Sequence, residues 1–128
     1  MHAIIIGGGV AGPATAMALQ RAGIDATVYE AYDRTADGVG AFLTLAVNGL
    51  EALRVLGLDE HVARLGIDTP RITLRNGAGR ALATFENGPR RPDGTVSQTV
   101  RRADLYVALR DEAVRRGVEV RFGKRLVD

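Results

Sequence analysis

A glycine cluster between a strand-like run and a helix-like run constrains the fold of this chain more than any other feature. Residues 3–6, Ala-Ile-Ile-Ile, are apolar and mostly β-branched, which predicts a strand buried on both faces of a parallel sheet. Gly7 to Gly12 follow in the pattern G-x-G-x-x-G, and residues 10–22 carry apolar side chains at helical spacing before Gly23. A strand, a glycine turn and a helix in this order predict the start of a dinucleotide-binding β–α–β unit.

Each position of the glycine turn has a physical role in such a site. Gly7 permits the tight turn out of the strand, Gly9 lets the backbone approach a pyrophosphate, and Gly12 lets helix and strand pack closely. Val10 and Ala11 belong to the same predicted cofactor site, because the free N–H groups and the positive dipole end of a helix start hold phosphate charge. The alternative is a tight strand-to-helix turn that binds nothing.

A second strand-like run, residues 25–30, closes the predicted β–α–β unit and ends on an acidic residue. Glu30 lies 18 residues beyond Gly12, a spacing typical of a carboxylate that accepts hydrogen bonds from an adenosine ribose. The same charge opposes a 2′-phosphate, which disfavours NADP at this position. Ala31, the next residue, is included in the predicted cofactor site. The alternative for Glu30 is a solvated strand end.

The remaining pattern predicts an α/β fold of the Rossmann type, with a parallel sheet, helices and one small β-hairpin. Asn48 and Glu51 resemble a capping box that opens a helix, and Gly57 is expected to end that helix. The hairpin is expected to turn at residues 76–79, Asn-Gly-Ala-Gly. The other expected segments are a loop at 31–40, a short helix at 59–64, hairpin strands at 72–74 and 81–85, an exposed loop at 88–94, strands at 96–100 and 118–122, and a helix at 103–116.

The composition predicts one globular domain over residues 1–128 and excludes several classes of function. Hydrophobic residues make up 46% of the chain and charged residues 25%, which is typical of a folded domain. Lys and Arg number 17 against 15 Asp and Glu, and no basic run exceeds two residues, so no nucleic-acid partner is expected.

Residue types that are absent narrow the chemistry further. The chain has no cysteine, which excludes disulfides and thiolate metal sites and favours a reducing, cytoplasmic location; no metal is expected. The apolar run at the N-terminus is shorter than a signal-peptide core, and no stretch approaches twenty apolar residues, so no membrane association is expected. His2 and His61 have no carboxylate or serine at a telling spacing, and no catalytic residue is predicted.

Several segments together resemble a known family, the class A FAD-dependent aromatic hydroxylases, which are similar to para-hydroxybenzoate hydroxylase. The resemblance rests on five segments that occur in the family's order and spacing: Ile4 to Pro13, Val28 to Glu30, Gly40 to Leu45, Asn48 to Leu58, and Val100 to Leu109. It implies FAD as the cofactor, NAD(P)H as the co-substrate of the full enzyme, and an aromatic or polyketide-like substrate that receives oxygen from O2.

The resemblance also implies roles for individual residues. Glu30 would bind the adenosine ribose, and Arg34 would lie beside the ribose or the pyrophosphate. Arg102 would contact the phosphate or ribityl side of the flavin, and Leu126 would offer backbone hydrogen bonds to the adenine edge. For Arg34 and Arg102 the alternative is an ordinary surface arginine.

The main departure from the family is length. Family members are several times longer and carry further on an Asp-Gly motif, a Gly-Asp motif and a sheet domain that holds the substrate. The resemblance therefore implies the N-terminal part of the FAD-binding domain, catalytic only as part of a longer or complemented chain. A complementing chain or a second copy of the same chain is the expected protein partner. Two alternatives remain open, namely a non-catalytic nucleotide-binding or interaction module and half of an NAD-dependent oxidoreductase.

Overall fold

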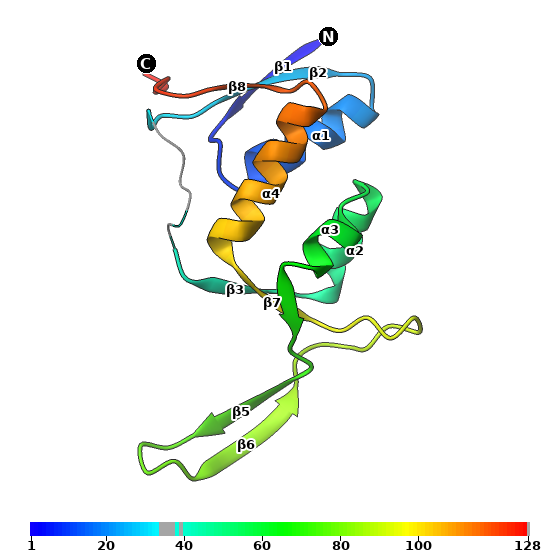
Figure 1. Cartoon of the computed structure of the whole chain (residues 1–128), viewed down its shortest axis with the longest axis vertical. Coiled ribbons are helices and arrows are strands. Elements are labelled where there is room, and N and C mark those ends of the chain that lie inside the picture. The colour runs from blue at the N-terminus through cyan, green and yellow to red at the C-terminus, as the bar shows by residue number, and fades with distance from the viewer. Residues whose placement is uncertain (34–37, 39, 128) are drawn as a thin grey trace. The chain divides into compact units, whose positions relative to one another are not determined.

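The structure is a computed structural model that describes residues 1–33, 38 and 40–127. The chain divides into two compact units, which Figure 1 shows with their elements labelled. The first unit joins Met1–Ala41 to Arg102–Asp128, and the second comprises Phe42–Arg101. Two stretches that are distant in sequence thus build the unit that contains the glycine turn.

The first unit is a three-stranded parallel sheet with two helices. Its strands are β1 (His2–Ile6), β2 (Asp25–Tyr29) and β8 (Glu119–Arg121), in the order β1-β2-β8. Helix α1 (Ala11–Arg21) connects β1 to β2, and helix α4 (Arg102–Arg115) leads into β8. Strand pairing runs in parallel from His2 opposite Asp25 to Ile6 opposite Tyr29. This confirms the predicted Rossmann-type β–α–β unit, with boundaries close to those expected.

The two faces of this sheet differ in burial. Val28 on β2 is fully buried, whereas Ile4 and Ile6 on β1 are 68% and 53% exposed. The connections from β1 to β2 and from β2 to β8 run in the same direction across the sheet. Because such connections are right-handed, they place α1 and α4 on the same face of the sheet, as Figure 1 shows. The expectation that residues 3–6 are buried on both faces is therefore wrong for this chain.

The second unit is built on an antiparallel sheet in the order β3-β7-β4. Its strands are β3 (Phe42–Leu45), β4 (Gly66–Asp68) and β7 (Gln98–Arg101), and helices α2 (Val47–Val55) and α3 (Asp59–Ala63) lie between β3 and β4 in sequence. Strand β7 and both helices were expected, but β3 and β4 were not. Strand β4 has three residues, too few to give a readable alternation of polar and apolar positions.

The expected capping box at the start of α2 is wrong. The helix begins after Ala46, which makes no side-chain capping bond, and the side chain of Asn48 accepts a hydrogen bond from the N–H of the next residue. Glu51 instead lies 2.5 Å from Arg54 and 3.1 Å from Arg91. Two guanidinium groups are stronger partners for a carboxylate than a helix N–H, so Glu51 serves an ion-pair cluster.

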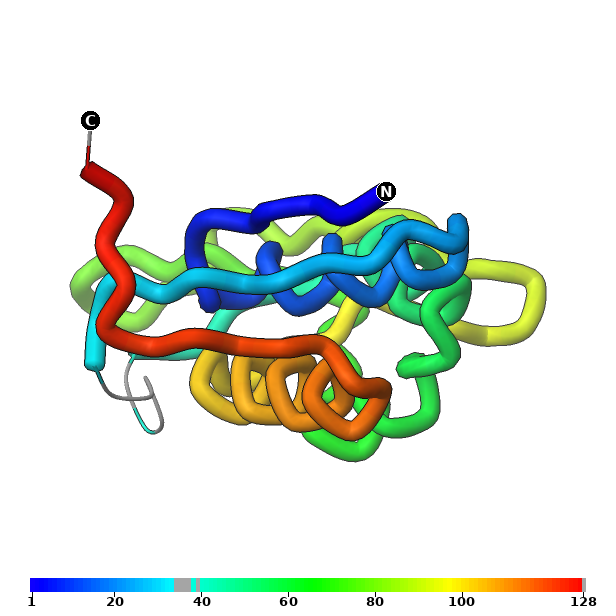
Figure 2. The backbone as a smooth tube through the Cα atoms, turned by 90° about the horizontal axis from the view of Figure 1, so that it is seen from above, coloured from blue at the N-terminus to red at the C-terminus, as the bar shows by residue number. Residues whose placement is uncertain are grey.

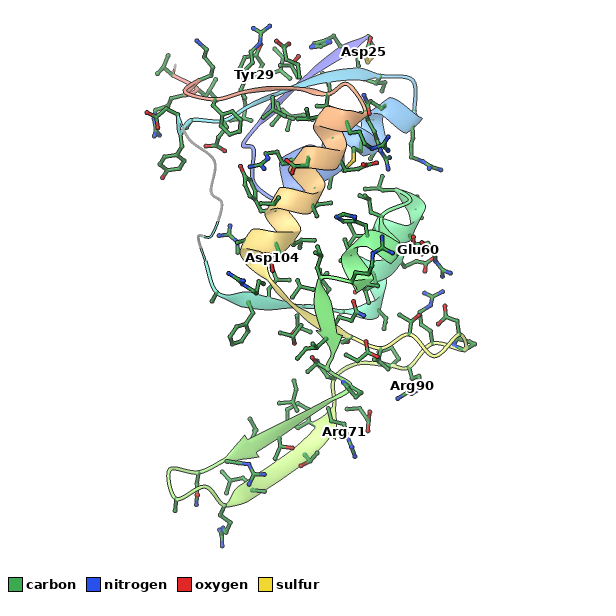
Figure 3. All side chains as sticks on the ribbon, in the orientation of Figure 1. Asp25, Tyr29, Glu60, Arg71, Arg90 and Asp104 are labelled. Carbon is green, nitrogen blue, oxygen red and sulfur yellow. The ribbon has the colours of Figure 1, made fainter. Side chains whose placement is uncertain are left out.

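The remaining part of the second unit is the predicted hairpin, formed by β5 (Arg71–Arg75) and β6 (Ala81–Glu86). The Asn76 side chain accepts hydrogen bonds from the N–H groups of Ala78 (3.1 Å) and Arg80 (2.9 Å), and Gly79 adopts a φ of +78°. These local bonds set the turn where the sequence predicted it. Arg71, labelled in Figure 3, lies at the open end of the hairpin.

Candidate functional site

The turn between β1 and α1 requires glycine at two of its positions. The N–H of Gly7 donates to the carbonyl of Tyr29 at 2.8 Å, and Gly7 adopts a φ of +105°, which L side chains rarely adopt. A Cβ on Gly12 would lie 2.0 Å from the carbonyl oxygen of Gly7. The helix therefore packs directly on the turn, as the sequence predicted for Gly12.

Gly9 has a different environment from the other two glycines of the motif. A Cβ added to Gly9 would meet no atom within 4 Å, and its φ is not in the left-handed region. The fold itself therefore makes no steric demand for glycine here. An open approach to the backbone at this point matches the expectation that a pyrophosphate comes close to Gly9.

The start of α1 is suited to a negatively charged group. Val10 is the N-cap residue and makes no side-chain capping bond, and the first turn, which begins at Ala11, carries no acidic side chain. Pro13 is buried in this turn and has no N–H to satisfy. The uncapped N–H groups and the positive end of the helix dipole therefore point into the glycine turn.

Glu30 follows β2 and lies against the glycine turn. Its Oε2 accepts a hydrogen bond from the N–H of Gly8 at 2.7 Å, and its Oε1 accepts one from the N–H of Tyr32 at 3.0 Å. Glu30 and the adjacent Ala31 are both half-buried. The structure thus brings Glu30 and Ala31 together with the turn from Gly7 to Gly12.

Arg102 lies at the first position of α4, on the same edge of the sheet as the glycine turn. Figure 2 shows that α1 and α4 both begin beside the carboxyl ends of the parallel strands, the edge where α/β sheets bind ligands. Arg102 is exposed, its N–H donates to Ala41 at 2.9 Å, and its side chain passes within 3.4 Å of the position of a Cβ on Gly40. Arg34, the other predicted arginine, lies outside the described residues.

Leu126 lies beyond β8 beside a groove over the uncovered face of the sheet. Its side chain is 70% exposed. Arg121, on β8, lies over the Tyr29 ring at 5.6 Å and, through its hydrogen bond, lowers the pKa of the Glu119 carboxyl. Figure 3 labels Asp25 and Tyr29, the two ends of β2. The groove is lined by Ile4, Ile6, Tyr29, Gly123, Lys124, Arg125 and Leu126.

Sequence reasoning missed two residues of this arrangement. Gly8 stands at a variable position of the glycine motif, yet it bonds Glu30, and a Cβ there would lie 3.0 Å from the Cβ of Glu30. Tyr32 contributes through its backbone N–H, which no sequence pattern identifies. The run of three consecutive glycines was the available signal for Gly8.

Two further findings concern the described part of the chain. Within residues 1–33, 38 and 40–127, no group of three or more His, Asp or Glu side chains is placed to hold a metal ion. None of the helices described above is long and apolar enough to cross a membrane.

A parallel β–α–β unit with an open glycine turn, an uncapped helix start and a carboxylate after the second strand defines the dinucleotide-binding class of domain. Comparison with known proteins makes the assignment specific. The family model described as "FAD binding domain" matches residues 1–128, and the chain therefore belongs to this family.

The relatives of this chain include two hydroxylases from Klebsiella. It is 31% identical over its whole length to 3-hydroxybenzoate 6-hydroxylase of Klebsiella oxytoca and 33% identical over 98% of its length to FAD-dependent urate hydroxylase of Klebsiella pneumoniae. It spans 33% of the length of each of these curated relatives.

Solved structures agree with these relationships. Klebsiella pneumoniae HpxO, solved with FAD and uric acid, matches all of the chain with a TM-score of 0.81 and 30% identity, and the chain covers 32% of it. Tetrameric 2-methyl-3-hydroxypyridine-5-carboxylic acid oxygenase matches 95% of the chain with a TM-score of 0.80 and 25% identity, and the chain covers 31% of it. The predicted family, fold class and cofactor, FAD, are thereby confirmed.

Proposed function

We propose that this chain holds the ADP half of FAD between the turn from Gly7 to Gly12 and the carboxylate of Glu30. The observation that carries the proposal is the contrast among the glycines. The fold itself explains Gly7 and Gly12, by backbone conformation and by close packing, whereas Gly9 faces open space. A pyrophosphate at the start of α1 supplies the reason that the fold does not.

The proposed site residues include four besides Glu30 and the glycine turn. Ala31 would line the ribose beside Glu30. Arg102, at the start of α4, would contact the phosphate or ribityl side of the flavin, and Arg34 would lie near the ribose or the pyrophosphate. Leu126 would offer its backbone to the adenine edge. The exposed guanidinium of Arg102 at the ligand-binding edge of the sheet supports its part of this assignment.

The activity of the whole protein is proposed as the NAD(P)H- and O2-dependent hydroxylation of an aromatic or polyketide-like compound. When bound, FAD supplies this chemistry by accepting a hydride and then activating O2. The names of the relatives, which include hydroxylases of 3-hydroxybenzoate and urate, support this class of substrate. The residues of this chain bind and orient the ADP end of the cofactor.

Two further features of the whole protein belong to the same proposal. We propose a cytoplasmic location, because the reaction draws on cellular NAD(P)H. We also propose that a complementing polypeptide, or a second copy of the chain, covers the side chains that the first unit leaves exposed on its sheet. Ile4 and Ile6, more than half exposed on a strand without Asp, Glu, Lys or Arg, support such a covering.

Titration of FAD and ADP into the purified protein tests the proposed site. Flavin fluorescence reports FAD binding, and calorimetry reports ADP binding. The Gly9→Val variant should lose binding of both ligands while keeping its fold, because an added Cβ meets no atom within 4 Å and the side chain occupies the approach of the pyrophosphate.

Gly77→Val is the matched control. Gly77, in the turn of the hairpin, likewise has no atom within 4 Å of an added Cβ and no left-handed φ. The Gly77→Val variant should bind FAD and ADP as the wild type does. Equal affinity of wild type and Gly9→Val for FAD and ADP would contradict the assignment of the pyrophosphate site to Gly9.

An activity assay tests whether the 128 residues are sufficient for catalysis. The purified protein, mixed with FAD, NADH or NADPH and a panel of phenols, should show no substrate-dependent oxidation of NADH or NADPH. Hydroxylation of a phenol coupled to that oxidation would contradict the proposed need for further polypeptide.

A further inference from the structure

The carboxylate of Glu30 is held by two turns at once. Oε2 accepts the N–H of Gly8 at 2.7 Å, and Oε1 accepts the N–H of Tyr32 at 3.0 Å. Hydrogen bonds to a charged acceptor are stronger than those between neutral groups. Each carboxylate oxygen has a second lone pair, so both bonds can persist while Glu30 accepts hydrogen bonds from a ribose.

The contact between Gly8 and Glu30 is close enough that a side chain on Gly8 would displace Glu30. A Cβ on Gly8 would lie 3.0 Å from the Cβ and 3.2 Å from Oε2 of Glu30, whereas one on Gly9 would meet nothing within 4 Å. The two neighbouring glycines therefore face different partners. Gly8 faces the carboxylate, and Gly9 faces the space in which the pyrophosphate is proposed to lie.

The backbone around Glu30 ties in a third segment. The N–H of Glu30 donates to the carbonyl of Arg121 at 2.8 Å, and the N–H of Lys124 donates to the carbonyl of Glu30 at 2.8 Å. The N–H of Gly123 donates to the carbonyl of Tyr32 at 2.7 Å. Glu30 is thus the point at which the glycine turn, the turn after β2 and the segment leading to Leu126 are joined.

We propose that Glu30 is a positioning residue for the phosphate site in addition to any bond that it makes to the ribose. Its carboxylate holds the peptide of Gly8, and so sets the orientation of the following N–H groups that meet the pyrophosphate. The N–H of Gly8, which already donates to this carboxylate, is not one of the phosphate donors. This inference rests on the proposed ADP site.

Ligands without ribose hydroxyls separate the two roles of Glu30. In the Glu30→Ala variant, both carboxylate oxygens are removed, so the bonds to Gly8 and Tyr32 are both lost. ADP and 2′,3′-dideoxy-ADP are titrated into wild type and variant, because the dideoxy compound keeps the pyrophosphate but cannot bond Glu30 through its sugar. The positioning role predicts about a tenfold loss of affinity for the dideoxy compound as well. Equal affinity of both proteins for 2′,3′-dideoxy-ADP would overturn the proposal.

The Gly8→Ala variant tests the same contact without changing any charge. Its methyl group should push the Glu30 side chain aside and weaken 2′,3′-dideoxy-ADP binding, while Gly77→Ala, where an added Cβ likewise meets no atom within 4 Å, should bind this compound as the wild type does. A readout without ligand is the amide proton of Gly8, followed by NMR and by hydrogen exchange. Its exchange should accelerate at least tenfold in Glu30→Ala, and unchanged exchange would contradict the proposal. Failure of wild type to bind ADP would instead contradict the proposed function, so the two failures are distinguishable.

Discussion

The β–α–β core of the first unit and the β5–β6 hairpin of the second are both β-containing segments, yet they are stabilised in opposite ways. Met17, Val28 and Ala113 in the first unit have no exposed surface, whereas every residue of β6 is exposed. The first unit also pairs Thr27 with Glu119, across 92 residues of sequence, while the hairpin pairs residues at most fifteen apart, such as Arg71 and Glu86.

This difference shows that a segment can form regular secondary structure without contributing much to the stability of the fold. The hairpin is specified by its turn and by cross-strand contacts such as the 3.0 Å hydrogen bond between Thr73 and Thr84. A two-stranded ribbon of this kind is marginally stable by itself in water. The first unit has a core, so its unfolding should be cooperative and insensitive to changes in the hairpin.

The largest expected effect comes from adding one methyl group to a glycine of each region. In Gly12→Ala the new Cβ meets the carbonyl oxygen of Gly7 at 2.0 Å, and α1 cannot keep its position against the turn. We expect the free energy of unfolding to fall by roughly 3 kcal/mol or more. Urea unfolding followed by far-UV circular dichroism measures this change.

Gly77→Ala is the corresponding change in the hairpin turn, where the added Cβ meets no atom within 4 Å. It should alter the free energy of unfolding by no more than about 0.5 kcal/mol. If both alanine variants lose the same stability, the packing of α1 on the turn is not what requires Gly12.

A somewhat smaller effect is expected from truncating an apolar side chain in each region. Met17 has no exposed surface, and Met17→Ala should cost about 2–5 kcal/mol through lost burial and the cavity left behind. Leu82 on β6 is 59% exposed, so Leu82→Ala should change stability by less than about 0.5 kcal/mol. Thermal and urea unfolding measure both. Equal losses would show that the hairpin belongs to the cooperative core.

The same contrast explains what the sequence could predict. The glycine turn, the β–α–β unit and the hairpin each depend on contacts between residues close in sequence, and each was predicted to within a few residues. Burial of the sheet could not be predicted, because the apolar run at residues 3–6 is compatible with one or with two covered faces. The side that helices cover depends on the direction of the crossovers, which no single strand reveals.

The residues of the site likewise fall into those that the sequence could predict and those that it could not. Gly7, Gly9, Gly12 and Glu30 could be predicted, since each has a side-chain or backbone property tied to a position in the motif. Gly8 and Tyr32 contribute backbone N–H groups to Glu30, and every residue except proline has such a group. Their part in the site follows from three-dimensional geometry and could not be predicted from residue type.

The smallest expected effect is a pH dependence that resides in the first unit. Glu112 on α4 accepts hydrogen bonds from Arg115 at 2.6 Å and from Arg116 at 2.7 Å. The bond to Arg115, reinforced by Arg116, lowers the pKa of Glu112 from 4.5 to about 2. A carboxyl whose pKa is depressed by folding contributes stability above its unfolded pKa and loses this contribution as the pH falls through its folded pKa. The contribution of Glu112 should therefore be complete above pH 4.5 and decline as the pH falls toward 2.

In Glu112→Gln this titration is removed. The variant should be less stable than wild type by about 1 kcal/mol above pH 4.5, because the pair with Arg115 is largely solvated, and the difference should shrink toward zero as the pH approaches 2. Urea unfolding at a series of pH values measures the difference. Glu86→Gln, in the hairpin, is the control and should follow the wild-type curve, because the hairpin contributes little to the cooperative unfolding of the first unit. If Glu86→Gln changes the acid limb as much as Glu112→Gln does, the hairpin and the first unit unfold together, and the separation of the two regions fails.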